Sequence, residues 1–403
     1  MTARCDVAIA GGGLVGLSTA YELATRGAQV TVIDAGLPGR ATDAGAGILS
    51  PETNGSDDPF WWELGCRAGA HYPLLLERLR ADGITTESSG YARCGLLSVG
   101  LRESEETWFA PFADGVRART GGRVHEITPA AASALFPPLG SVHRVLHSAD
   151  AARIDGRGMA AALHQASERR GVRFVSGAVS GVSAVAGAAG AGATAANLGA
   201  DGAAGAAEAA GRMAHRLTID GREDLLCGAF VVAGGAWSAA LGELLECPLP
   251  ISPTKGQIVH LGTTQESADW PIVQPLLTHY LVPWPGGRVA CGGTFEADAG
   301  FSASVTAAGL HELLRECLVV APGLADADYL FARVGLRPTS SDDRPIVGAI
   351  PGWANVWVAT GHGANGLLLG PYTAALVAEE MAGGTSGTPR RKVPPELDPA
   401  RFC

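Results

Sequence analysis

The sequence predicts an α/β protein that combines a mainly parallel sheet covered by helices with a second, interleaved α+β domain built on an antiparallel sheet. Two patterns support this fold class. Strand-like and helix-like segments alternate near the start, in the middle and at the end of the chain, and strand-like runs separated by Pro and Gly turns fill residues 250–300. The length of 403 residues suits two or three domain-sized units, and 47% hydrophobic against 17% charged residues supports a large core.

The first 34 residues predict a strand, a tight turn, a helix and a second strand. Asp6–Ala10 is a short apolar run, typical of a buried strand. Apolar residues between positions 14 and 24 recur at helical spacing, and Gly27 is a suitable helix end. Gln29–Asp34 is apolar again and rich in β-branched residues, which favours a second strand.

The rest of the chain repeats these elements. Residues 60–82 predict a helix, Gly158–Arg170 predicts another that is followed by a strand at Val172–Val175, and residues 303–320 predict a third. The runs GQIVHLG, YLVPW and RVACGGTF predict strands of the antiparallel sheet. The last 80 residues return to a strand, a Gly-rich turn and a helix.

Residues 184–214 differ from the rest of the chain. This Gly/Ala-rich stretch has no aromatic residue and almost no large apolar one, so it cannot bury enough surface to offset its ordering entropy. Its flanks, Val172–Val182 and Leu217–Val232, resemble strands. We therefore expect a flexible insertion between two strands, without a catalytic role.

The charge and the chain ends exclude several classes of protein. The net charge is -10, so the phosphates of nucleic acids and anionic membranes would be repelled. No secretory signal and no stretch of about 20 apolar residues occurs, so we expect neither export nor a membrane span. The 56 glycines show no collagen-like period, which leaves flexible linkers or tight turns close to a ligand.

The cysteine and histidine positions indicate no metal site. None of the eight cysteines forms a CxxC pair, so we expect reduced thiols in a cytoplasmic protein. His143 and His147 are four apart, but their segment resembles a strand, which would separate them by about 13 Å.

The turn Gly11-Gly12-Gly13-Leu14-Val15-Gly16 matches the GxGxxG pattern of dinucleotide-binding sites. It lies between a predicted strand and a predicted helix, which is the context that the pattern requires. Gly11 permits the turn, Gly13 lets the backbone approach a pyrophosphate, and Gly16 allows close packing of the helix on the strand. Asp34 ends the second strand, where it can accept hydrogen bonds from a ribose. The motif alone does not distinguish NAD from FAD.

Three later segments carry a resemblance to a known family. Gly39–Pro51 (GRATDAGAGILSP), Val231–Ser238 (VVAGGAWS) and Gly335–Gly348 (GLRPTSSDDRPIVG), which is followed by Thr360–Pro371 (TGHGANGLLLGP), occur in this order. With the N-terminal turn they resemble the D-amino-acid oxidase (DAO) superfamily, and glycine oxidase most closely. The resemblance covers nearly the whole chain apart from the 184–214 insertion. It implies a Rossmann-like FAD-binding domain of the GR2 type and an interleaved α+β substrate domain.

The resemblance implies FAD as the cofactor and assigns it a set of contacts. Small residues in Gly39–Pro51 would let the backbone lie along the flavin, and the N–H groups before the last helix would point at its N1–C2=O edge. Within that turn, His362 is either a base or, as we favour, a positioning residue. The residues expected to bind FAD are Gly11, Gly13, Leu14, Val15, Gly16, Asp34, Ala35, Arg40, Thr42, Gly45, Ala46, Gly47, Val179, Gly234, Trp237, Gly361, His362, Gly363, Asn365, Gly366 and Leu367.

An amino acid is best held by its carboxylate, and a bidentate Arg is the natural clamp. By resemblance Arg337 occupies the position of that clamp and Tyr280 that of the tyrosine that joins it; a slip of one residue would make His279 the candidate instead. Glycine oxidase-like chains often carry an Arg where this chain has Ala364, so the substrate preference can differ from glycine. Sarcosine oxidase-like relatives attach flavin covalently through a Cys of the C-terminal signature. The matching stretch Leu336–Arg344 has no Cys, so the resemblance implies non-covalent FAD.

The resemblance thus predicts an FAD-dependent oxidase for a glycine, D-amino-acid or N-alkyl-glycine type of substrate. Hydride would pass from the substrate Cα to flavin N5, the imino acid would become a 2-oxo acid and ammonia, and oxygen would be reduced to hydrogen peroxide. The alternatives are a dehydrogenase that uses a quinone or protein acceptor, a biosynthetic oxidase for an unusual amino acid, and a flavin-binding subunit without turnover. The oligomeric state is not determined by the sequence, and a homo-oligomer is one possibility.

Two further features have open interpretations. Phe60-Trp61-Trp62 forms either an aromatic lid at the site entrance or ordinary helix packing, and Lys255 is either an oxygen-activating cation or part of a strand.

We expect the FAD-binding domain to be discontinuous, covering residues 1–85, 148–242 and 326–403. The substrate-binding domain is expected to cover residues 86–147 and 243–325.

Overall fold

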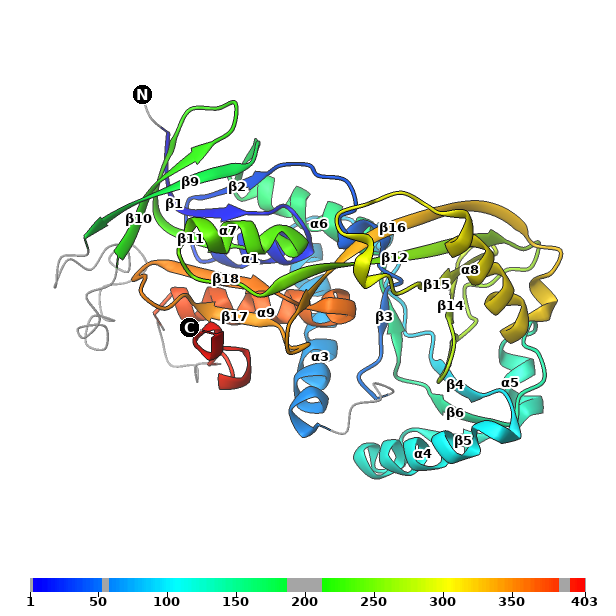
Figure 1. Cartoon of the computed structure of the whole chain (residues 1–403). Coiled ribbons are helices and arrows are strands. Elements are labelled where there is room, and N and C mark those ends of the chain that lie inside the picture. The colour runs from blue at the N-terminus through cyan, green and yellow to red at the C-terminus, as the bar shows by residue number, and fades with distance from the viewer. Residues whose placement is uncertain (1–2, 53–57, 187–211, 384–391, 403) are drawn as a thin grey trace.

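A computed structural model describes residues 3–52, 58–186, 212–383 and 392–402, and it contains two large sheets (Figure 1). The first sheet has the order β17-β18-β11-β1-β2-β8, with the β9–β10 hairpin joined to β11. Its strands are β1 (Ala3–Ala10), β2 (Val30–Asp34), β8 (Arg173–Ser176), β9 (Val179–Ala186), β10 (Arg212–Ile219), β11 (Leu225–Val232), β17 (Ile346–Ala349) and β18 (Val356–Thr360). The strands from β18 to β8 run parallel, which confirms the predicted α/β class.

The second sheet has the order β16-β12-β15-β14-β13-β4-β6-β5. Its strands are β4 (Leu96–Gly100), β5 (His125–Ile127), β6 (Arg144–Ser148), β12 (Ile251–Gly262), β13 (Ile272–Pro275), β14 (Tyr280–Trp284), β15 (Arg288–Gly292) and β16 (Asp328–Ser340). All pairs are antiparallel except β13 with β4. β16 belongs to this sheet, although we expected residues 326–340 in the other domain. The division into domains stays a prediction.

Helices cover the first sheet and lie on both faces of the second. They are α1 (Leu14–Ala24), α2 (Ala41–Ala44), α3 (Pro59–Ala81), α4 (Glu106–Thr120), α5 (Pro129–Leu135), α6 (Gly156–Arg169), α7 (Ser238–Leu244), α8 (Ala307–Val320) and α9 (Gly366–Met381). A short two-stranded sheet pairs β3 (Ile48–Leu49) with β7 (Ala152–Arg153), and β3 lies between the two large sheets (Figure 1). Apolar side chains of α1, α3, α6 and α9 form one core, and those of α8 and the second sheet form another. None of the described helices is long and apolar enough to cross a membrane.

Capping residues explain where several helices begin. Asp58 accepts a hydrogen bond from the Phe60 amide and Pro59 follows it at the first turn, so α3 begins at Pro59. Thr306 accepts a hydrogen bond from the Gly309 amide, so α8 begins at Ala307 rather than at 303 as predicted.

The predicted insertion is shorter than residues 184–214. Arg212 pairs with Ala186 and Ala214 with Ala184, so the outer three residues at each end extend the β9–β10 hairpin. Strands can pair there without a large apolar face, because the backbone supplies the hydrogen bonds. Residues 187–211, which hold the rest of the expected insertion, lie outside the described residues.

His143 and His147 do not converge. The His147 ring contacts His125 across the β5–β6 pair, and His143 Nε2 lies 3.5 Å from a Glu106 carboxylate oxygen. Within the described ranges, no group of three or more His, Cys, Asp or Glu side chains could hold a metal ion. The described cysteines are free thiols.

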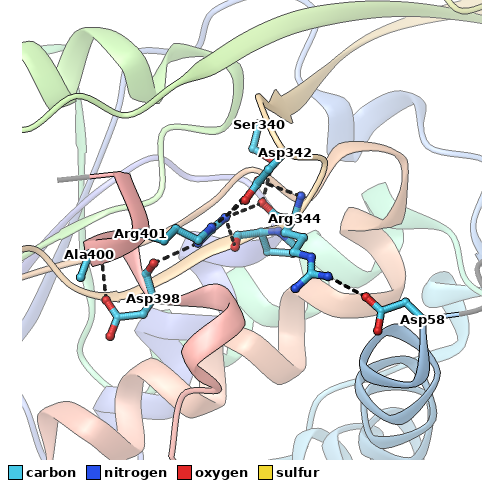
Figure 2. A network of polar contacts seen from close by, with 8 residues as sticks. Asp58, Ser340, Asp342, Arg344, Asp398, Ala400 and Arg401 are labelled. Carbon is cyan, nitrogen blue, oxygen red and sulfur yellow. Dashed lines mark hydrogen bonds and ion pairs between the residues drawn. The ribbon is translucent and has the colours of Figure 1, made fainter.

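A polar network joins the turn after β16 to two distant segments (Figure 2). The Arg344 guanidinium donates to Asp58 at the start of α3 over 2.7 Å. Arg401 donates to Asp342 over 2.8 Å and to the Arg344 carbonyl over 3.0 Å. The network therefore holds the end of β16, the first turn of α3 and the C-terminal segment together.

Candidate active site

A cavity of about 540 Å³ lies between the two large sheets. Four consecutive neighbours in the parallel sheet, β18, β11, β1 and β2, all end at it, and their following turns line it. The second sheet presents the face of β12, β13, β14 and β16 as the opposite wall. Ligands of open α/β sheets bind at the carboxyl ends of such strands, so the cavity is where this architecture places a ligand.

The turn between β1 and α1 requires its glycines. Gly11 has φ +115°, and a Cβ there would lie 2.2 Å from the Ala233 carbonyl oxygen. A Cβ at Gly16 would lie 1.9 Å from the Gly11 carbonyl oxygen, so the helix could not approach the turn with any larger residue. Gly16 does not itself line the cavity, which agrees with its predicted packing role.

Two helices direct their N-terminal ends at the cavity. α1 is preceded by Gly13 and α9 by Asn365, and neither residue caps its helix with a side-chain hydrogen bond. Both residues line the cavity, as do Gly235 and Gly363, where a Cβ would meet no atom within 4 Å. The positive end of each helix dipole makes this wall suited to an anionic ligand.

Asp34 and Arg40 form an ion pair at one end of the cavity. Asp34 ends β2 as predicted, and Gly12 lies beneath its carboxylate, since a Cβ there would come within 2.7 Å of Oδ2. Arg40, one of the residues expected to bind FAD, is therefore engaged by a carboxylate in this structure. Thr42 accepts a hydrogen bond from the first α1 amide, Leu14 N–H, over 3.0 Å.

Arg337 lies on the opposite wall, on β16. It is opposite Thr254 of β12, and its guanidinium lies over Gly256, where a Cβ would come within 2.5 Å of it. One nitrogen donates to the Thr294 carbonyl over 2.9 Å, and the Phe295 ring lies 5.8 Å from the guanidinium carbon. Because a guanidinium has five N–H donors, these contacts orient it and leave donors for a ligand.

Tyr280 lines the cavity, and His279 does not. Adjacent residues of a strand face opposite sides, and His279 contacts Glu312 of α8 over 3.0 Å instead. Burial raises the pKa of Tyr280 to about 12, although the Arg337 charge opposes this shift. Its hydroxyl is therefore a protonated hydrogen-bond donor at neutral pH.

Lys255 is buried on the other side of β12 and does not line the cavity. Its ammonium lies 3.0 Å from Glu296. Glu296 also accepts hydrogen bonds from Gln257 over 2.7 Å and from Thr294 over 2.6 Å. Burial raises the pKa of Glu296, but these hydrogen bonds and Lys255 outweigh it and hold the pKa below its usual value. This arrangement favours a structural role for Lys255 over an oxygen-activating one.

His362 lies at the turn before α9 and is almost completely buried. Its Nε2 is 2.8 Å from the Thr373 hydroxyl, and burial lowers its pKa to about 4. The ring is therefore neutral at physiological pH and bound to its own helix, which suits positioning better than proton transfer.

Two of the three aromatic residues at the start of α3 take part in the helix packing. Phe60 and Trp61 pack against the core of α1, α3 and α9, and the Arg344 guanidinium lies over the Phe60 ring. Neither ring lines the cavity. Trp237 does line it, and it stacks on Phe301 with ring centroids 5.7 Å apart.

The cavity brings together every predicted site residue except Gly16 and Gly361, which pack behind its wall. Sequence reasoning missed several lining residues of the second sheet. Gly256, Ile258 and Gln274 belong to no recognisable motif, and only the strand register places them beside Tyr280 and Arg337.

Comparisons with known proteins match this architecture. Residues 6–380 match the family model described as DAO, FAD dependent oxidoreductase. YurR of Bacillus subtilis (strain 168), an uncharacterised oxidoreductase, is 33% identical over 386 residues, which are 93% of this chain and 94% of that protein. The crystal structure of iminodiacetate oxidase from Chelativorans sp. BNC1 has a TM-score of 0.82 and 33% identity, covering 95% of this chain and 97% of that one. Glycine oxidase from Geobacillus kaustophilus has a TM-score of 0.80 and 26% identity, covering 96% of each chain.

Proposed function

We propose that this chain, which belongs to the DAO family of FAD-dependent oxidoreductases, oxidises a small amino acid at the carbon that bears its amine. The family membership confirms the predicted resemblance and FAD as the cofactor. The observation that carries the substrate class is the pair of Arg337 and Tyr280 on one wall of the cavity, opposite the glycine turns of the other. A guanidinium beside a protonated phenol is suited to a carboxylate.

The residues of the first wall fit FAD. Open space beside Gly235 and Gly363 suits a flat ring. The N-terminal ends of α1 and α9 suit a pyrophosphate, and the Asp34 carboxylate suits a ribose. We assign the cofactor to this wall, held by the residues predicted from the sequence. When bound, FAD supplies the acceptor for the hydride that leaves the substrate Cα. The absence of Cys in Leu336–Arg344 supports non-covalent attachment.

The second wall orients the substrate. The Arg337 donors bind both carboxylate oxygens, and the Tyr280 hydroxyl donates a further hydrogen bond. No described carboxylate on this wall lines the cavity, so the substrate amine has no acidic partner that would keep it charged. A neutral amine can release the Cα hydride, so the wall favours the reactive protonation state. Fixing the carboxylate also fixes Cα, which is where most of the catalytic advantage of such a site arises.

The product would be an imino acid, which water converts to a 2-oxo acid and ammonia. We propose oxygen as the final electron acceptor, giving hydrogen peroxide, with a quinone or protein acceptor as the alternative. A cytoplasmic location and a homo-oligomeric state stay predictions from the sequence.

Anaerobic mixing of the holoenzyme with glycine, sarcosine and D-amino acids tests the proposal. We expect the visible flavin absorbance to bleach with at least one of them, and loss of bleaching with every primary and secondary amino acid would reject it. Oxygen uptake measured beside reduction of an artificial dye separates the oxidase from the dehydrogenase.

A further inference from the structure

Gln274 is a polar side chain of the second wall that the proposed reaction does not use. It belongs to β13 and lines the cavity together with Tyr280, Ile258 and Arg337. Neither a charge nor a described hydrogen-bond partner explains an amide at this position. A polar group at a cavity wall requires a partner when a ligand displaces water from it, because an unpaired amide costs free energy.

The strand register places Gln274 beside Tyr280. Val273 is opposite Leu281 in the antiparallel β13–β14 pair, which puts Gln274 opposite Tyr280. Tyr280 is in turn opposite Gly292, and Gly292 is opposite Ile258. Residues opposite one another share a face of the sheet, so the amide and the phenol form one row of the wall.

The row continues from Gln274 to a hydroxyl group. Ser98 of β4 is in register with Gln274, and its hydroxyl is buried without a described hydrogen-bond partner. Ser98 does not line the cavity, and Leu146, which is opposite it, packs in an apolar cluster with Phe109 of α4. At this end of the row, Gln274 is therefore the polar side chain that a ligand in the cavity can reach.

The same wall carries little charge. Arg337 is the charged residue among the described side chains that the second sheet contributes to the cavity. Ala364 lines the cavity from the opposite side without adding a cation. A second carboxylate on the ligand would therefore lose its hydration without gaining a counter-charge, which is costly. A hydroxyl or a carboxamide would be satisfied by Gln274 without that cost.

We propose that Gln274 selects substrates whose side chain or N-substituent ends in an uncharged hydrogen-bonding group, such as a hydroxyl or carboxamide. The inference rests on the proposed function, because Arg337 fixes the carboxylate from which the substituent extends. It assigns Gln274 a specificity role and leaves the oxidation step to the groups already described.

Binding of inert carboxylates to the holoenzyme isolates this interaction. Propionate and 3-hydroxypropionate differ by one hydroxyl, and their dissociation constants can be read from the perturbed flavin absorbance. We expect Gln274→Met to weaken 3-hydroxypropionate about three- to tenfold, the loss typical of one hydrogen bond, and to leave propionate unchanged. Gln274→Asn, which keeps the amide, should retain part of the preference. Gln265→Met, in an exposed turn outside the cavity, is the matched control and should change neither constant.

Kinetics with D-serine, D-alanine, D-asparagine and iminodiacetate extend the test. Gln274→Met should raise the KM of D-serine and D-asparagine relative to D-alanine, and the wild type should prefer D-asparagine to iminodiacetate. The inference would be overturned if Gln274→Met weakened the binding of propionate and 3-hydroxypropionate equally. It would also be overturned if the variant kept the wild-type preference for D-serine and D-asparagine over D-alanine. If no amine is oxidised, the proposed function fails, while the inert pair still reports whether Gln274 reads the hydroxyl.

Discussion

The two walls of the cavity are built on different principles. The first-sheet wall consists of backbone turns, in which Gly11 and Gly16 are required because a Cβ would overlap a carbonyl oxygen. The second-sheet wall consists of side chains on strand faces, with Arg337, Tyr280 and Gln274 brought together by register. The comparison teaches that Gly11 and Gly16 of the first wall leave no room for a larger residue, while the second wall can change its chemistry one residue at a time.

The largest expected effect is on the first wall. Gly11→Ala should abolish FAD retention and lower the thermal midpoint, because the methyl group would lie 2.2 Å from the Ala233 carbonyl oxygen. The ratio of flavin to protein absorbance and thermal unfolding measure both effects. Gly36→Ala is the control, since Gly36 also has positive φ but a Cβ there would meet nothing within 4 Å. Equal losses in both variants would assign the effect to backbone strain instead of the close approach.

The next effect is on the clamp. Arg337→Met should raise the KM for the amino-acid substrate by about two orders of magnitude, because removing one partner of a desolvated charge pair costs about 2–5 kcal/mol. FAD content should stay at the wild-type level, since Arg337 belongs to the other wall. Arg315→Met on the exposed face of α8 serves as the control. Wild-type steady-state kinetics for Arg337→Met would reject the clamp.

Gly256→Ala tests whether the clamp depends on the space beneath it. The added methyl would come within 2.5 Å of the Arg337 guanidinium, a flexible group that can move away. We expect the KM to rise about tenfold with little change in the thermal midpoint, because misplacement of a clamp costs orientation rather than folding. A large loss of stability with an unchanged KM would show that this glycine serves the sheet and not the site.

A smaller effect is expected at Tyr280. Tyr280→Phe should lower kcat/KM about three- to tenfold, the loss of one hydrogen bond to a charged group. The pKa of Tyr280 is about 12, so its hydroxyl stays protonated and the ratio of wild type to variant should be constant between pH 6 and pH 10. Steady-state pH profiles of both proteins measure this. A ratio that changes within that range would mean that the phenol ionises during turnover.

The smallest catalytic effect is expected at Lys255. Because its ammonium pairs with Glu296 on the far side of β12, Lys255→Met should leave the rate of flavin reoxidation by oxygen unchanged while lowering stability. The pKa of Glu296 is below its usual value of 4.5. The ionised carboxylate therefore stabilises the folded protein fully above that pH, and this stabilisation is lost as the pH falls through the lowered pKa. Thermal midpoints of Glu296→Gln and wild type should therefore converge at acid pH. Slow reoxidation in Lys255→Met would restore the oxygen-activation hypothesis.

More of the first wall than of the second could be predicted from local sequence motifs, and the reason is physical. A backbone turn that excludes a Cβ demands glycine at particular spacings, so Gly11, Gly13 and Gly16 are visible in a local motif. Arg337 and Tyr280 were predicted through family resemblance, and their location at the cavity agrees with it. Gln274 was missed because an amide in a short strand looks like any other, and only pairing between distant segments gives it a neighbour.

The exact ends of helices and strands are a second feature that the sequence pattern did not predict. The start of α8 depends on one hydroxyl, Thr306, and the extent of the β9–β10 hairpin depends on backbone pairing. Neither leaves a hydrophobic period in the sequence. Periodicity therefore located the elements but did not give their exact ends.

The row of Gln274, Tyr280, Gly292 and Ile258 also constrains how the protein can evolve. A slip of one residue in β14 would turn Tyr280 toward α8 and bring His279 into the cavity, so an insertion or deletion that shifts a strand would exchange every side chain that this strand presents to the cavity. A substitution within the row changes one contact, and the other residues of the row still face the cavity. We therefore expect specificity among close relatives to diverge by point substitution along this row, while length variation collects in loops that leave the register intact.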